Sequence, residues 1–226
     1  MRRFATTHVP AAGEFVHLAQ DVSHHMLRVT GIAPGERIEL FDGSGVIALA
    51  ELCSVEDGMA IVRILEHQVA GEEAHSLHLI IAQLRANVLD TVLRMSTELG
   101  VTDVTIVQAE RCVARGDKRE RWGRIVQSAA GQSGRSSWPT IHPPSDLRDV
   151  IAIPTGTVGR ICVPGFPELP TSVVQGPQRV LIGPEGGWTE DEVDLASEQG
   201  WLPMGLGSTV LRADTAAVAA IVRCRY

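Results

Sequence analysis

A glycine-rich segment near the C-terminus has the residue types best suited to holding a ligand. An apolar run ends at Ile182 and leads into Gly183-Pro184-Glu185-Gly186-Gly187. Thr189 and Glu192 lie three residues apart, the spacing of a capping box, so a helix is predicted to begin directly after the glycines. Three glycines in five residues permit positive φ and let a ligand approach the backbone. Two interpretations stay open: a ligand-binding loop or a tight structural turn.

The residues around these glycines argue against the two common nucleotide-binding loops. No Lys-Ser/Thr pair follows the glycines, and the GxGxxG pattern is absent. Glu185 and the acidic residues after the loop repel phosphate. The segment therefore favours a neutral or cationic ligand held by backbone groups.

A second candidate segment runs from Met204 to Ala217. A short strand is predicted to end at Gly207, and Asp214 or Thr215 is predicted to cap the helix that follows. Small side chains at the start of that helix permit close packing against a loop or a flat ring. Arg212 is a strong cation directly before the helix. It contacts a substrate in one interpretation and pairs with Asp214 at the surface in the other.

The segments between these candidates alternate between strand and helix. The patterns predict strands at 77–83, 104–107, 160–163 and 180–182, and helices at 87–99, 119–130, 189–199 and 214–223. Strands that alternate with helices build a parallel sheet covered on both faces. The sequence therefore predicts an α/β domain.

The first seventy residues follow a different pattern. Polar and apolar residues alternate in short runs at 36–41, 46–52 and 59–65, separated by turn residues, which predicts antiparallel strands and a small barrel. A short helix is predicted at 21–29, capped by Asp21 or Ser23. The small and polar residues 68–76 form a candidate linker. We therefore expect one domain over 1–70 and another over 75–226.

Composition limits the classes of protein. The net charge is −7, 44% of residues are hydrophobic, and no apolar run approaches the roughly 20 residues that span a bilayer. No apolar signal segment follows the N-terminal arginines, so a cytoplasmic protein is predicted. The four cysteines are too far apart for a zinc motif, which predicts reduced thiols and no metal.

Positive charge is concentrated in one stretch of this acidic chain. Between Glu110 and Arg135 there are seven basic and three acidic residues. A local basic patch can bind phosphates, because screening limits the reach of distant acidic groups to about 10 Å. A solvated amphipathic helix is the alternative interpretation.

Several blocks together resemble the RsmE family of 16S rRNA uracil-N3 methyltransferases, in the SPOUT superfamily. The C-terminal blocks are Leu181–Gly187 and Leu206-Gly207 with Val210–Ala216. The central blocks are Thr97–Val101, Glu110–Cys112, Arg121-Trp122 and Gln132–Arg135, and the N-terminal blocks are His24–Val29 and Leu40–Gly43. The resemblance covers essentially the whole chain. Departures from the family pattern occur at Leu84–Asn87, Arg94-Met95, Thr209 and Asp214.

The resemblance implies a fold and a cofactor. It implies an N-terminal PUA-like β-barrel, a C-terminal SPOUT α/β domain with a deep trefoil knot, and a homodimer. It also implies an S-adenosylmethionine site with neither metal nor membrane involved. The cofactor residues it implies are Leu181, Ile182, Gly183, Pro184, Glu185, Gly186, Gly187, Leu206, Gly207, Leu211, Thr215 and Ala216.

The resemblance also implies a substrate, which is uridine 1498 (standard numbering) of 16S rRNA in the small ribosomal subunit. In this interpretation Arg212 is catalytic, and the RNA-binding residues are Arg2, Arg3, Arg28, Arg111, Arg121 and Arg135. Two alternatives stay open. One is a SPOUT methyltransferase that acts on another RNA, and the other is an RNA-binding ribosome-assembly factor without catalysis.

Overall fold

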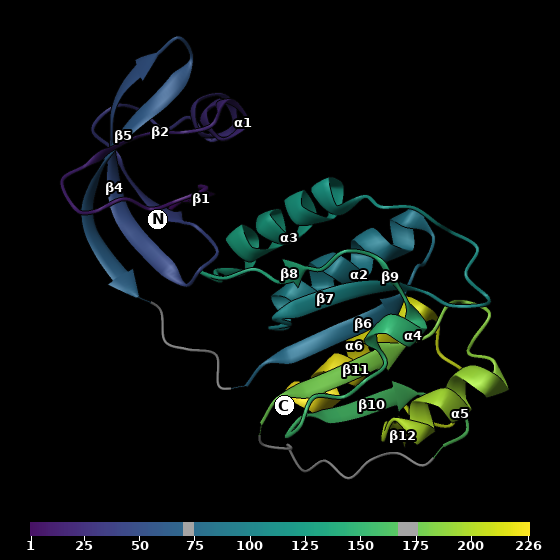
Figure 1. Ribbon diagram of the computed structural model, residues 1–226. Helices are drawn as coiled ribbons and strands as arrows, with labels where there is room; N and C mark the ends of the chain where they lie inside the picture. Colours follow the sequence, from purple (N-terminus) through teal and green to yellow (C-terminus); the bar gives the residue numbers. More distant parts are fainter. Residues whose placement is uncertain (70–74, 167–175) are drawn as a thin grey trace. The chain divides into compact units, whose positions relative to one another are not determined.

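The computed structural model describes residues 1–69, 75–166 and 176–226 and divides into two compact units (Figure 1). Unit 1 contains the described residues up to 69 together with Gln127–Trp138. Unit 2 contains the described residues from 75 to Val126 and from Pro139 to Tyr226. Most of the predicted linker 68–76 lies outside the described residues.

Unit 1 is built on a five-stranded sheet. Its order is β1-β3-β4-β5-β2, in which only the β1–β3 pair is parallel. The strands are β1 (Arg3–Ala5), β2 (Phe15–His17), β3 (Arg37–Phe41), β4 (Val46–Glu56) and β5 (Met59–Val69). The predicted strands at 36–41, 46–52 and 59–65 are confirmed. Asp57 and Gly58 both have positive φ, as a tight hairpin between β4 and β5 requires.

The helix predicted at 21–29 is present, but it begins one residue earlier and its last turns are π-helical. It consists of α1 (Gln20–His24) and a π-helical continuation, η1 (His25–Val29), in which the N–H of Thr30 donates to the His25 carbonyl at 3.0 Å. The predicted caps are wrong. Asp21 lies inside the helix, and the buried Ser23 hydroxyl accepts the N–H of Ala60 at 3.0 Å instead. The Ser23 hydroxyl therefore bonds to a strand residue 37 positions further along the chain and does not cap the helix.

Unit 2 is built on a parallel sheet, as predicted. The order is β12-β10-β11-β6-β7-β8, with β9 also paired to β7, and every pair is parallel. The strands are β6 (Leu77–Ala82), β7 (Asp103–Gln108), β8 (Thr140–Ile141), β9 (Ser145–Asp146), β10 (Val158–Cys162), β11 (Gln178–Ile182) and β12 (Leu202–Met204). The predicted end of the last strand at Gly207 is wrong, because the strand ends at Met204.

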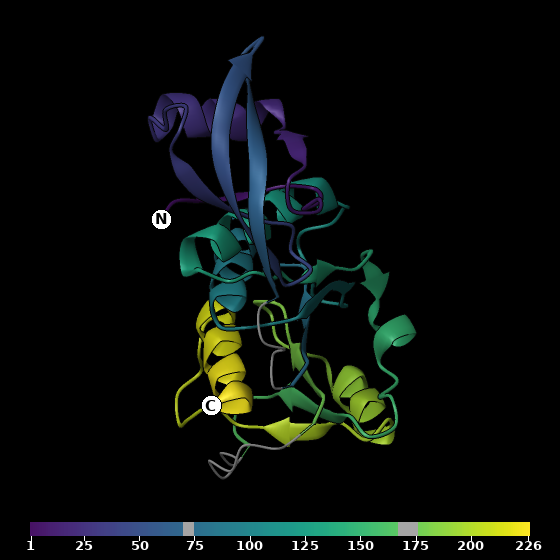
Figure 2. The same cartoon turned by 90° about the vertical axis from the view of Figure 1, so that its left-hand side faces the viewer.

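Helices cover both faces of this parallel sheet (Figure 2). On one face α2 (Ala86–Glu98) packs against α6 (Ala213–Arg225), and on the other α4 (Leu147–Val150) and α5 (Glu190–Glu198) enclose an apolar core. The remaining helix, α3 (Arg119–Ser133), begins in unit 2 and ends in unit 1. No helix among the described residues is long and apolar enough to cross a bilayer.

Two helix starts matter for the candidate segments. The capping box at α5 is confirmed: Thr189 Oγ1 accepts the Glu192 N–H at 3.2 Å, and Glu192 Oε2 accepts the Thr189 N–H at 2.9 Å. The predicted cap of α6 is wrong. Arg212 occupies the capping position without a side-chain bond, while Asp214 Oδ1 accepts the N–H of Thr215 inside the first turn.

Candidate functional site

The two candidate segments lie together around one pocket of unit 2, with a volume of about 740 Å³. It opens where three neighbouring strands end, at Cys162 of β10, Ile182 of β11 and Met204 of β12. Ligands of open parallel sheets commonly bind outside the carboxyl ends of the strands. The strand order therefore brings loops that are far apart in sequence to one site.

Most of the predicted cofactor residues line this pocket: Ile182, Gly183, Pro184, Glu185, Gly186, Gly187, Leu206, Gly207, Leu211 and Ala216. Leu181 and Thr215 do not. Leu181 is fully buried in the core on the α4/α5 side of the sheet, and Thr215 is exposed at the start of α6. Both belong to elements that form the pocket, but their side chains lie elsewhere.

Sequence reasoning missed part of the wall. Cys162, Val163 and Pro164 at the end of β10 line the pocket, as do Trp188, Val193 and Met204. The residues of β10 could not be assigned from their own pattern, because only the strand order places β10 between β11 and β12. Trp188 had a usable signal, since it directly follows the glycines.

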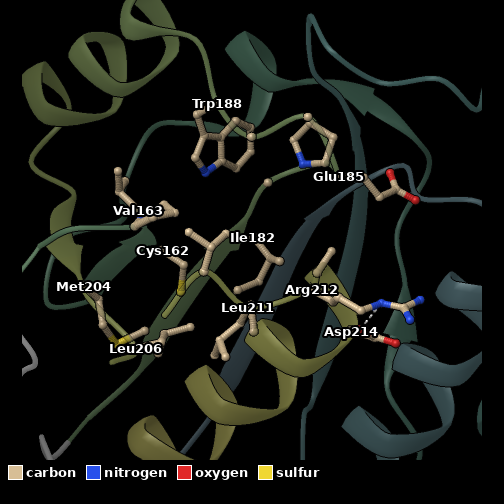
Figure 3. A pocket seen from close by; sticks show the side chains of 18 of the residues that line it. Cys162, Val163, Ile182, Glu185, Trp188, Met204, Leu206, Leu211, Arg212 and Asp214 are labelled. Atoms are coloured by element: carbon tan, nitrogen blue, oxygen red, sulfur yellow. Dashed lines mark ion pairs between the residues drawn. The ribbon is translucent and has the colours of Figure 1, made fainter. Parts of the chain in front are cut away.

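Charged groups gather on one side of the pocket and apolar groups on the other (Figure 3). Glu185, Arg212 and Asp214 lie on the charged side, opposite Val163, Met204 and Leu206. Arg212 Nε is 3.8 Å from Asp214 Oδ1, and the Arg212 side chain is 80% exposed. Arg212 therefore pairs with Asp214 and also lines the pocket.

The apolar part of the pocket contains two groups with unusual environments. Trp188 Nε1 is buried and donates to no acceptor among the described residues. Burial, together with the neighbouring Cys224, raises the pKa of the Cys162 thiol, so Cys162 is neutral at physiological pH. An unpaired buried N–H is rare in proteins and marks a position where a ligand acceptor would be favourable.

Hydrogen bonds join the glycine segment and the start of α5 to residues that follow β6 and β7. Arg111 Nη1 donates to the carbonyl oxygens of Gly186 and Trp188 at 3.1 and 3.2 Å. Glu185 Oε1 accepts the N–H of Arg85 at 3.2 Å, and Glu192 Oε1 accepts the N–H of Glu110 at 2.8 Å. Arg111 thus lies beside the pocket, although its side chain is not part of the pocket wall.

The other arginines predicted to bind RNA differ in their surroundings. Arg3 Nε lies 2.8 Å from Glu39 and its guanidinium lies 5.4 Å from the centre of the Phe41 ring. Arg121 forms an ion pair with Asp90, and Arg135 donates to Ser137 Oγ at 3.3 Å. Arg2 and Arg28 are exposed, and their side chains have no ion pair among the described residues.

The basic stretch is partly neutralised by nearby acids. Arg119 pairs with Asp117 at 2.8 Å, and Arg124 pairs with Glu120 at 3.0 Å along α3. Arg115 and Lys118 form no ion pair among the described residues. The number of cations available to phosphate is therefore smaller than the sequence count indicates. No group of His, Cys, Asp or Glu that could hold a metal occurs in the described part of the chain.

Comparison with protein families gives an independent line of evidence. Residues 71–225 match the family described as RNA methyltransferase domain. The chain is 31% identical over 211 residues to ribosomal RNA small subunit methyltransferase E of Synechocystis sp., which covers 88% of this chain and 69% of that protein.

Solved structures agree. The chain resembles a ribosomal RNA small subunit methyltransferase E from Neisseria gonorrhoeae, bound to S-adenosyl methionine, with a TM-score of 0.91 and 35% identity. That likeness covers 98% of this chain and 95% of the other. A putative methyltransferase from Legionella pneumophila, in complex with the same cofactor, has a TM-score of 0.88 and 28% identity, and the likeness covers 97% and 95% of the two chains.

Proposed function

The chain belongs to the RNA methyltransferase family, among the small subunit methyltransferase E proteins, and we propose that it methylates N3 of a uridine in 16S rRNA. The methyl donor is S-adenosylmethionine. The observation that carries this proposal is the pocket at the ends of β10, β11 and β12, since it has an apolar side and a charged side. Uridine 1498 of the small subunit is the proposed target.

The residues of the pocket fit this cofactor. Its volume of about 740 Å³ is in the range of small-molecule sites. Small residues such as Gly207 and Ala216 leave room for a flat adenine ring, and the buried Trp188 N–H offers a donor. The two arginines that line the pocket, Arg85 and Arg212, are balanced by Glu185 and Asp214. A sulfonium cation therefore meets no excess of positive charge.

The bound cofactor supplies an electrophilic methyl carbon. For N3 of uracil to accept it, the N3 proton must leave to solvent, and negative charge must develop across the two flanking carbonyl groups. A fixed cation beside one of those oxygens stabilises that charge. Arg212 is the proposed cation, because it lines the charged side of the pocket and is exposed enough to reach a substrate. Asp214 Oδ1 lies 3.8 Å from Arg212 Nε on the same side of the pocket.

The RNA substrate requires a surface outside the pocket. N3 lies on the Watson–Crick edge, so the uridine must be unpaired or flipped out before it can react. We propose that unit 1 folds as the PUA-like barrel and contacts RNA through Arg2 and Arg28, with Arg115 and Lys118 contributing from unit 2. The same proposal includes a trefoil knot, a homodimer, a division into domains over 1–70 and 75–226, and a cytoplasmic location.

Calorimetric titration tests the pocket assignment. The full chain should bind one S-adenosylmethionine per chain, and Arg212→Ala should bind it with the same affinity within about threefold. A chain that binds no cofactor would contradict the proposal. Cofactor binding without methyl transfer to any RNA would leave the binding site in place and reject the enzymatic part.

A further inference from the structure

We propose that Arg111 is a positioning residue for the cofactor segment Gly183–Trp188, rather than a contact to RNA phosphate. The inference rests on the proposed function, because it assigns the same pocket to S-adenosylmethionine. It begins with the carbonyl groups of Gly186 and Trp188, both of which accept hydrogen bonds from Arg111 Nη1, at 3.1 and 3.2 Å. One cation thus holds two points of the segment, two residues apart.

The shape of the segment agrees with this role. A Cβ on Gly186 would lie 3.2 Å from the Cβ of Arg111 and 3.5 Å from its Cδ. The stem of Arg111 therefore packs directly on the backbone of Gly186, and a glycine there permits this approach. Gly186 thus faces the pocket on one side and Arg111 on the other.

A second link joins the same two stretches of chain. Glu192 Oε1 accepts the N–H of Glu110 at 2.8 Å, while Glu192 Oε2 accepts the N–H of Thr189 at 2.9 Å. Glu110 precedes Arg111, and Thr189 follows Trp188. The segment after β7 is consequently joined to the segment after β11 by two side chains, the carboxylate of Glu192 and the guanidinium of Arg111. We call these two side chains and their hydrogen bonds the brace.

The brace has a physical consequence for affinity. A segment with three glycines has many accessible conformations, and a ligand that orders it must offset that entropy. Contacts that fix the segment before the ligand arrives remove this cost and raise the affinity. Arg111 does so from behind the wall, since it is not among the residues that line the pocket. Both N–H groups of Arg111 Nη1 have acceptors in the carbonyl oxygens of Gly186 and Trp188, which assigns this end of the side chain to the segment.

Four variants of the full chain test the assignment, each titrated with S-adenosylmethionine in the absence of RNA. Arg111→Ala should weaken cofactor binding about fivefold, and Arg111→Lys, which keeps the charge, should recover it only in part. Glu192→Gln should also weaken it, because the two N–H groups bond to different oxygens of Glu192 and the substitution replaces one of these oxygens by an NH2 group that cannot accept. Arg124→Ala is the matched control: it removes the same charge from an exposed position of α3, where Arg124 pairs with Glu120, and should leave cofactor affinity unchanged.

Steady-state kinetics and RNA binding provide a readout that a loss of folding would not give. Arg111→Ala should raise the KM for the cofactor while the KM for RNA and the RNA affinity stay within twofold of wild type. Thermal unfolding of each variant identifies any that fails to fold, and Arg111→Lys then carries the test.

Two results would overturn the proposal: wild-type cofactor affinity in Arg111→Ala, or a loss of RNA affinity in Arg111→Ala as large as its loss of cofactor affinity. If the wild-type chain itself bound no cofactor, the proposed function would fail, whereas wild-type binding that Arg111→Ala leaves unchanged would reject the brace alone.

Discussion

The indole ring of Trp188 lies against Gly183, so closely that a Cβ on Gly183 would be 3.0 Å from Cε2 of the ring and 3.1 Å from its Nε1. Both residues line the same pocket, and Trp188 forms one of its walls (Figure 3). The position of the ring is therefore set by the absence of a side chain at residue 183. Any larger residue there has to displace the ring.

Gly183→Ala should weaken binding of S-adenosylmethionine about fivefold, because the new methyl group displaces the Trp188 ring and changes the shape of the wall. Calorimetric titration measures the effect. Gly123→Ala is a suitable control, since a Cβ at Gly123 in α3 meets no atom within 4 Å. Equal affinity of Gly183→Ala and wild type would show that the ring position does not matter for the cofactor.

Arg212→Ala should lower kcat about a hundredfold and change cofactor affinity little, since its proposed partner is the charge that develops on the uracil carbonyl. Arg212→Lys should retain part of the rate. Single-turnover methyl transfer to small ribosomal subunits, at saturating cofactor, separates this step from binding. A kcat at the wild-type value in Arg212→Ala would rule out the proposed role.

Acid should destabilise unit 2 through His78. Burial, aided by the charge of Arg179 and by His142 and opposed by Asp103, lowers the pKa of His78 to about 4, and His78 Nε2 lies 2.8 Å from Thr105 Oγ1. Since an unfolded histidine has a pKa near 6.5, the unfolded chain takes up a proton that the folded chain does not. The stability that depends on a neutral His78 is therefore fully present above pH 6.5 and is lost as the pH falls towards 4.

The expected loss is about 2 kcal/mol in the free energy of unfolding between pH 8 and pH 5. His78→Gln should remove most of this pH dependence, whereas His8→Gln, at an exposed position, should keep it. Urea unfolding at the two pH values measures the difference. The same pH dependence in His78→Gln as in wild type would assign the effect to other groups.

RNA binding should depend on Arg28 more than on Arg121. Arg28 is exposed without an ion pair among the described residues, whereas Arg121 is paired with Asp90. Arg28→Ala should weaken binding to 16S rRNA and reduce the slope of log affinity against log salt by about one. Filter binding at several salt concentrations measures both values. A larger change in the slope for Arg121→Ala would reverse this assignment.

The sequence predicted those elements whose signals are local. The alternation at 36–41 and the apolar run from Leu77 gave β3 and β6, and Thr189 with Glu192 gave the start of α5. The strands β1, β2, β8 and β9 have two or three residues each, too few for a periodic pattern. They exist because a partner strand lies beside them, which no local pattern reveals.

The same distinction holds at the site. The glycine segment and the residues around Arg212 could be selected from their own composition, but the contribution of β10 depends on strand order. Arg111 was predicted to bind RNA because it belongs to a basic stretch. Its hydrogen-bond partners, Gly186 and Trp188, lie 75 and 77 residues further along the chain. The sequence therefore shows that Arg111 is positively charged, but it does not show which groups the Arg111 side chain contacts.

The most direct test of the central claim is the product of the reaction. Purified chain, S-adenosylmethionine and unmodified small ribosomal subunits are incubated together, and the digested RNA is analysed by mass spectrometry. We expect 3-methyluridine in the 16S rRNA, formed by the wild-type chain and strongly reduced with Arg212→Ala. RNA that lacks 3-methyluridine after incubation with a chain that binds the cofactor would contradict this claim.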